Sequence, residues 1–144
     1  PTLGFTLVGK ADRVDVLHDG AAHIYDYKTG KPPSKDQQLH FDKQLLLEVE
    51  MLRQGGFERL GARQVVGATY IGLGNDPEDA AAPMDETDVW AELSDLIRAY
   101  QDPEQGYSAR RAMLMADASS VYDHLARYGE WGTNQSALLI KVSK

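Results

Sequence analysis

Hydrophobic and polar residues alternate along the first part of the chain as they do in β-strands. This pattern covers residues 3–9 (LGFTLVG) and residues 13–17, which extend the first strand or begin a second one. His18-Asp19-Gly20 predicts a hairpin turn, because Asp-Gly accommodates the positive φ that tight hairpins need. Residues 23–29 (HIYDYKT) are then the predicted return strand, rich in aromatic and β-branched residues.

A helix and a central strand are predicted next. The two prolines of KPPSKD, residues 31–36, prevent the strand from continuing. Leucine and valine then recur at helical spacing between residues 36 and 53, and the glycine pair at 55–56 ends the helix. Residues 64–73 (QVVGATYIGL) form a nearly continuous apolar run, which is typical of a strand inside a sheet.

The second half of the chain has weaker patterns. Residues 74–87 form an acidic, proline-containing connection that we expect to be mobile, and residues 87–100 have the pattern of an amphipathic helix. Shorter elements are predicted at residues 109–116 and 121–128. We therefore expect an α/β domain over residues 1–131, followed at 132–144 by a tail that is either disordered or not native to the protein.

Composition narrows the class of protein. A chain of 144 residues with 42% hydrophobic residues is long enough for one domain with its own core. No apolar run approaches the roughly 18 residues of a membrane span, so we expect no membrane association. The absence of cysteine excludes disulfides, thiolate zinc sites and a cysteine-held iron–sulfur cluster in this chain, and it fits a cytoplasmic location. Because the chain starts at Pro1 without a signal peptide, we expect it to be a piece of a longer protein.

The net charge of −7 argues against a freestanding nucleic-acid binder, which usually has a basic face. The charge is uneven, however, because residues 1–64 contain nine basic and nine acidic residues. The whole acidic excess lies in residues 65–144. Net charge therefore says little about the chemistry of the first half.

The predicted strand at residues 23–29 contains an unusual charged pair. Asp26 and Lys28 are two residues apart, so they share one face of the strand. Asp12 or Asp15, on the preceding strand, is placed to approach Asp26. Two carboxylates near a lysine can bind Mg²⁺ and orient a water molecule for phosphodiester hydrolysis. A structural ion pair at a sheet edge is the commoner role of an Asp-x-Lys triplet and stays open at this point.

The order of these residues carries a resemblance. The segment GKADRVDVLHDGAAHIYDYKTGKPP resembles the core motif of the PD-(D/E)XK nuclease superfamily, and residues 5–56 are most similar to the RecB-type nuclease domain of AddB subunits in bacterial double-strand-break repair helicase–nucleases. That family has Gly-x-x-Asp-Arg-x-Asp, a turn, a strand with Asp-Tyr-Lys-Thr-Gly and a helix with a glutamine. The matching residues are Gly9, Asp12, Arg13, Asp15, Asp26, Tyr27, Lys28, Thr29, Gly30 and Gln44.

The resemblance implies a restriction-endonuclease-like fold, with a mixed central sheet flanked by helices. It implies a DNA exonuclease dependent on Mg²⁺ or Mn²⁺, active in end processing for recombinational repair beside an AddA-type helicase–nuclease subunit. The implied metal ligands are Asp12, Asp26 and the main-chain carbonyl of Tyr27, while Lys28 orients or activates the water. Gln44 is implied to contact the DNA backbone or to brace the catalytic site, and Arg13 and Asp15 are implied to be supporting partners around it. Lys31, in the turn just after Lys28, is placed to contact a phosphate of the DNA.

The chain departs from the family at several points. Position 48 is glutamate where the family usually has tyrosine, and the upstream helix with a metal-binding histidine would precede Pro1. We therefore expect this fragment to be weak or inactive as a nuclease. The alternative is a nuclease fold without catalysis that binds DNA or the partner subunit. A phosphoesterase acting on small substrates is a third hypothesis.

Overall fold

The computed structural model describes residues 3–75 and 77–106, together with positions 123–125, 127, 130 and 132. The chain divides into two compact units, Pro1–Asp95 and Leu96–Lys144, and the first contains the sheet and the helices that pack on it. The elements predicted at 109–116 and 121–128, and the tail at 132–144, lie outside the described residues apart from isolated positions.

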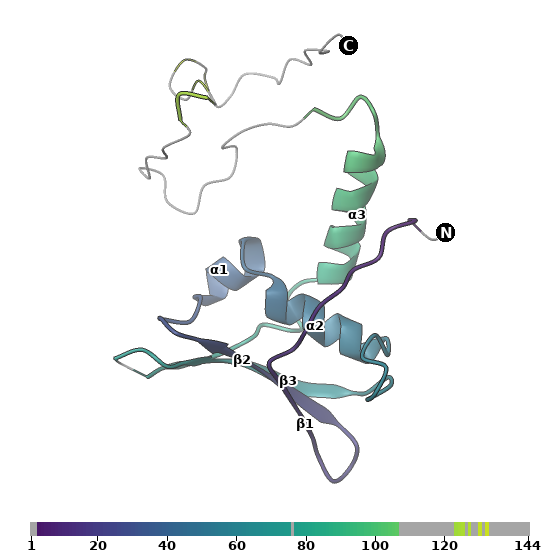
Figure 1. Cartoon of the computed structure of the whole chain (residues 1–144), viewed down its shortest axis with the longest axis vertical. Coiled ribbons are helices and arrows are strands. Elements are labelled where there is room, and N and C mark those ends of the chain that lie inside the picture. Colours follow the sequence, from purple (N-terminus) through teal and green to yellow (C-terminus); the bar gives the residue numbers. More distant parts are fainter. Residues whose placement is uncertain are drawn as a thin grey trace. The chain divides into compact units, whose positions relative to one another are not determined.

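The first unit is built on a mixed four-stranded sheet in the order β1-β2-β3-β4 (Figure 1). The strands are β1 Arg13–Val16, β2 Ala22–Lys28, β3 Val65–Gly72 and β4 Asp79–Ala81. The two central strands, β2 and β3, are parallel, and each edge strand pairs antiparallel with its neighbour. The sheet and its helices confirm the predicted α/β class and agree with a restriction-endonuclease-like fold.

The turn between β1 and β2 has the predicted chemistry. Gly20 has a φ of +86°, a conformation that favours glycine. The side chain of Asp19 accepts a hydrogen bond from the main-chain nitrogen of Ala21 at 3.0 Å. The nitrogen of Leu17 donates to the carbonyl of Ala21 at 2.8 Å, which closes the hairpin. This turn fixes the register in which Arg13 lies opposite Tyr25.

The predicted helix at 36–53 is divided into α1, Lys35–His40, and α2, Gln44–Arg53. Ser34 begins α1 through a capping box with Gln37. The break between the helices follows from a tertiary contact, because the buried hydroxyl of Tyr70 lies between the side chain of Asp42 and the main-chain nitrogen of Leu45, 3.2 Å from each. As a result, α2 begins at Gln44.

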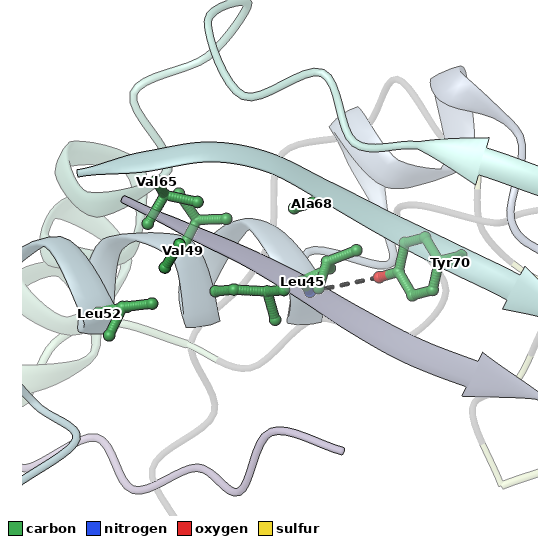
Figure 2. Close-up of a cluster of buried hydrophobic side chains, with 8 residues drawn as sticks. Leu45, Val49, Leu52, Val65, Ala68 and Tyr70 are labelled. Atoms are coloured by element: carbon green, nitrogen blue, oxygen red, sulfur yellow. Dashed lines mark hydrogen bonds between the residues drawn. The ribbon is translucent and has the colours of Figure 1, made fainter. Parts of the chain in front are cut away.

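One face of α2 packs on the sheet and forms the core (Figure 2). Its apolar stripe is completely or almost completely buried. Burial of each Leu or Val side chain contributes about 1.5–3 kcal/mol to folding. The core cluster consists of Ala22, Ile24, Leu45, Val49, Leu52, Val65, Ala68 and Tyr70.

Two predictions of secondary structure from the sequence were wrong. Residues 3–9 do not form a strand, and Phe5 and Val8 are 55% and 87% exposed. Alternation alone does not supply a partner strand, and this segment passes over α2, where Gly9 lies against Met51. The second error is at residues 74–87, where a connection was predicted and the structure has the short strand β4, whose three residues pair with β3.

The helix predicted at 87–100 is confirmed as α3, Val89–Gln101. The side chain of Asp88 accepts a hydrogen bond from the main-chain nitrogen of Ala91 at 2.9 Å and so caps its first turn. Glu92, in the same turn, forms an ion pair with Lys43 next to the start of α2. Within the described part of the chain, no helix is both long and apolar enough to cross a membrane.

Candidate active site

Asp26 and Lys28 lie on the face of β2 that packs against α2. Asp26 is only 4% exposed although it is a carboxylate, and Ile24, two residues earlier on the same face, is fully buried. The ammonium group of Lys28 lies 2.9 Å from Asp26 Oδ2. The side chain of Lys28 is 28% exposed, so the pair is at the border between the core and solvent.

Asp12 is brought to the same end of β2 from the neighbouring chain segment. Its Oδ2 accepts a hydrogen bond from the main-chain nitrogen of Tyr27 at 3.1 Å. A strand residue directs its N–H and its C=O to the same neighbouring strand. The carbonyl of Tyr27 therefore points to the side on which Asp12 lies, which suits the predicted set of Asp12, Asp26 and this carbonyl.

Gln44 is the first residue of α2, and its side chain contacts the charged groups of the site. Its amide nitrogen donates to Asp26 Oδ1 at 2.9 Å and to Glu48 Oε1 at 3.1 Å. Its amide oxygen accepts a hydrogen bond from Lys28 at 3.3 Å. A single side chain therefore contacts both acids and the lysine.

Glu48 belongs to this site, although the sequence showed it only as a departure from the family pattern. It is 4% exposed, on the buried face of α2 one turn after Gln44. Burial raises the pKa of the Glu48 carboxyl, and the charges of Asp26 and Asp12 raise it further, while the hydrogen bond from Gln44 acts in the opposite direction. Its helical spacing with Leu45, Val49 and Leu52 is a sequence signal that could have placed it on the buried stripe.

Tyr70 is a second residue that sequence reasoning missed. It lies beside Asp26 in the parallel pairing of β2 with β3, and it is fully buried. Its ring centre is 5.1 Å from the ammonium of Lys28, within the range of a cation–π contact. Burial raises the pKa of the Tyr70 hydroxyl, so it stays protonated and supports the start of α2 through Leu45.

Arg13 and Asp15 contact each other, and Arg13 also contacts residues on the face of β2 that points away from Asp26. Two nitrogens of Arg13 donate to the two oxygens of Asp15 at 2.8 and 2.6 Å, and these bonds hold the pKa of Asp15 below its usual range. Arg13 also lies over the ring of Tyr25 and donates to the hydroxyl of Tyr27. Both tyrosines alternate with Asp26 along β2, so Arg13 and Asp15 make these contacts on the face of β2 away from Asp26, where their role is structural.

Lys31, the other predicted DNA contact, is a surface residue. Its side chain is 79% exposed, and it lies 3.4 Å from Glu78. An exposed ion pair of this kind contributes little to stability. Lys31 is therefore accessible to a phosphate if it leaves Glu78.

The site fits a divalent cation bound by few protein ligands. Asp26 Oδ2 and Glu48 Oε2 are buried without a hydrogen-bond partner among the described residues. The ammonium group of Lys28 forms an ion pair with Asp26 Oδ2, but the angle between the two groups is not that of a hydrogen bond. No group of three or more His, Cys, Asp or Glu side chains in the described residues is arranged to hold a metal ion as it stands. Mg²⁺ commonly uses only one or two carboxylates, with water and substrate phosphate completing its shell.

The chain is similar to known proteins over part or most of its length. Residues 2–131 match the PD-(D/E)XK nuclease superfamily. A segment of 69 residues is 35% identical to an uncharacterized protein of Rickettsia felis, and it covers 47% of this chain but only 8% of that protein. No solved structure matches the chain. Because the family match extends over most of the sequence, the chain belongs to the PD-(D/E)XK nuclease superfamily.

Proposed function

We propose that this domain is a metal-dependent deoxyribonuclease that hydrolyses phosphodiester bonds. The observation that carries the proposal is the meeting of Asp12, Asp26 and Lys28 at one end of β2, with Asp26 buried. A buried carboxylate is costly unless it has a partner or a function. The superfamily match supports nuclease chemistry, while the cation and the DNA substrate are parts of the proposal.

In this proposal each residue of the site has a separate role. Asp12 and Asp26 would hold Mg²⁺ or Mn²⁺, with the carbonyl of Tyr27 as a third contact. The bound cation would polarise the phosphate and lower the pKa of a water molecule. Lys28 orients that water or offsets the negative charge that develops on the phosphate.

Lys28 is held in place on three sides. The ring of Tyr70, the amide oxygen of Gln44 and the carboxylate of Asp26 all contact its ammonium group. A positioned group avoids part of the entropic cost of reaching the transition state. This arrangement supports a catalytic role for the lysine.

We assign the domain to the RecB-type nucleases of AddB subunits on its motif order. On this assignment it is a cytoplasmic exonuclease that processes DNA ends for recombinational repair beside an AddA-type subunit. Gln44 and Lys31 would contact the DNA backbone. The exposed side chains of both residues are accessible for that role.

A nuclease assay on end-labelled linear DNA tests this function, in the 144-residue chain and in any longer protein of which it is a part. We expect cleavage with Mg²⁺ or Mn²⁺, weak at most in the 144-residue chain by itself, that is lost in Lys28→Met and Asp26→Asn. Lys35→Met is the matched control, because Lys35 is exposed and pairs with Glu86. Equal cleavage by the unaltered protein and its Lys28→Met form would contradict the proposal.

A nuclease fold without catalysis is the second candidate. Lys28 already neutralises Asp26, and no ready group of three metal-binding side chains exists among the described residues. Such a domain would bind DNA or the partner subunit only. Calorimetry with Mn²⁺ separates the two functions, since equal heats for the unaltered chain and Asp26→Ala would favour the scaffold.

A further inference from the structure

Glu48 occupies a position where a carboxylate is costly. The neighbouring buried positions of α2 are apolar, and Glu48 is only 4% exposed. Glu48 Oε1 accepts a hydrogen bond from Gln44, while Oε2 has no hydrogen-bond partner among the described residues. A charge is seldom buried in this way unless it is paired or binds a metal ion. The unpartnered oxygen therefore points to a ligand that is absent here.

Asp26 has a similar arrangement. Its Oδ1 accepts from the same amide nitrogen of Gln44, and its Oδ2 has only the ion pair with Lys28. One amide group thus holds two carboxylates together, and each of them keeps one oxygen without a hydrogen bond. Two adjacent carboxylates repel unless a positive charge lies between them.

We propose that Glu48 is a third carboxylate ligand of the divalent cation that Asp12 and Asp26 hold. This inference rests on the proposed function. The tyrosine that the family usually has at this position would supply no carboxylate, so the chain would bind its cation with one more negative charge than the motif implies.

Gln44 explains why the three acids are not already grouped as a metal site. Its amide nitrogen lies between Asp26 and Glu48 and occupies the place of a positive charge. Gln44 is exposed at the start of α2, so its side chain can rotate away without disturbing the core. The two freed oxygens, together with the two that have no hydrogen bond, can then face the cation.

A purely structural role for Glu48 makes a different prediction. If Glu48 only positioned Gln44, a glutamine at position 48 would still accept its hydrogen bond and would leave cation binding unchanged. If Glu48 is a ligand, the same substitution removes an anionic oxygen from the cation. Glu48→Gln therefore separates the two roles.

Isothermal titration calorimetry with Mn²⁺ alone tests the proposal on four proteins: the unaltered chain, Glu48→Gln, Glu50→Gln and Asp26→Asn. We expect Glu48→Gln to weaken Mn²⁺ binding about 10–100-fold, the range found when groups that support a metal are removed. Glu50→Gln, which removes a charge from the same helix where Glu50 pairs with Arg53, should bind as the unaltered chain does. Asp26→Asn should not bind measurably.

The outcomes distinguish this inference from the proposed function. If Glu48→Gln binds Mn²⁺ like the unaltered chain while Asp26→Asn does not, the role of Glu48 is overturned and the cation site stands. If Asp26→Asn also binds normally, or the unaltered chain does not bind, both proposals fail. A crystal structure with Mn²⁺ needs no variant: a bond from Glu48 to the ion supports the proposal, and Glu48 remaining on Gln44 beside a bound ion overturns it.

Discussion

The hydroxyl of Tyr70 accepts a hydrogen bond from the main-chain nitrogen of Leu45 at 3.2 Å (Figure 2). This contact joins the central strand β3 to the first turn of α2. It satisfies one of the main-chain N–H groups that the start of a helix leaves free. Gln44, the residue before Leu45, is the first residue of this helix, so the tyrosine supports the position from which Gln44 reaches Asp26.

Tyr70→Phe should destabilise the domain by about 1–3 kcal/mol, because it leaves the buried nitrogen of Leu45 without a partner. It also removes the hydrogen bond to Asp42. Urea unfolding measures the change. Tyr27→Phe is the control, since Tyr27 is 37% exposed and should cost no more than about 0.5 kcal/mol. Equal stability of the two variants would show that Tyr70 does not hold the start of α2.

Glu48→Gln should make the domain more stable at neutral pH in the presence of EDTA. Burial raises the pKa of Glu48 in the folded protein. A raised carboxyl pKa means that the folded state binds the proton more tightly than the unfolded state does. Its contribution to stability is fully present below the unfolded pKa and is lost as pH rises through the folded pKa.

The free energy of unfolding of the two proteins should therefore diverge as pH rises. Urea titrations between about pH 4 and about pH 8 measure this difference. A pH-independent difference between Glu48→Gln and the unaltered chain would contradict the raised pKa.

Asp26→Asn and Lys28→Met should both abolish cleavage, but they should differ in stability. Lys28→Met leaves a buried carboxylate without its ion pair and should cost about 1–3 kcal/mol. This is less than for a fully buried pair, because the side chain of Lys28 is 28% exposed. Asn at position 26 still accepts from Gln44 and carries no charge, so it should cost less. Thermal melts of both variants make the comparison, and a more damaging Asp26→Asn would refute it.

Gly67→Ala should destabilise the sheet by about 1–3 kcal/mol. A Cβ at this position would lie 2.4 Å from the ring of His23, which pairs with Gly67 across β2 and β3. His23 would have to move and lose its contact with Thr69, now 2.9 Å. Gly30→Ala is the control, because nothing lies within 4 Å of an added Cβ there. Chemical denaturation measures both, and equal midpoints would contradict the clash.

The sequence was most informative where the structure depends on neighbours along the chain. Asp19-Gly20 predicted the turn, and the two-residue spacing of Asp26 and Lys28 predicted their common face. In both cases local backbone geometry decides the result. The motif order then identified the site residues that the structure brings together.

The sequence was least informative where distant residues decide the result. The break before Gln44 depends on Tyr70, which is 26 positions further along the chain. The alternation at residues 3–9 lacked a partner strand, and no periodicity reports whether one exists. Glu48 stood out as a mismatch with a known motif, and only burial showed that it belongs to the site.

The Asp12 carboxylate also has a structural role, because it accepts a hydrogen bond from the main-chain nitrogen of Tyr27. Asp12→Ala would remove an acid from the site and also leave a main-chain N–H of β2 unpaired, so lost activity in that variant would combine two causes. Asp12→Asn retains one oxygen that can accept this bond, while it removes the negative charge and replaces the other oxygen by an NH2 group. Mutagenesis of the first acid should therefore use the amide, whose effect on hydrolysis can be attributed to chemistry alone.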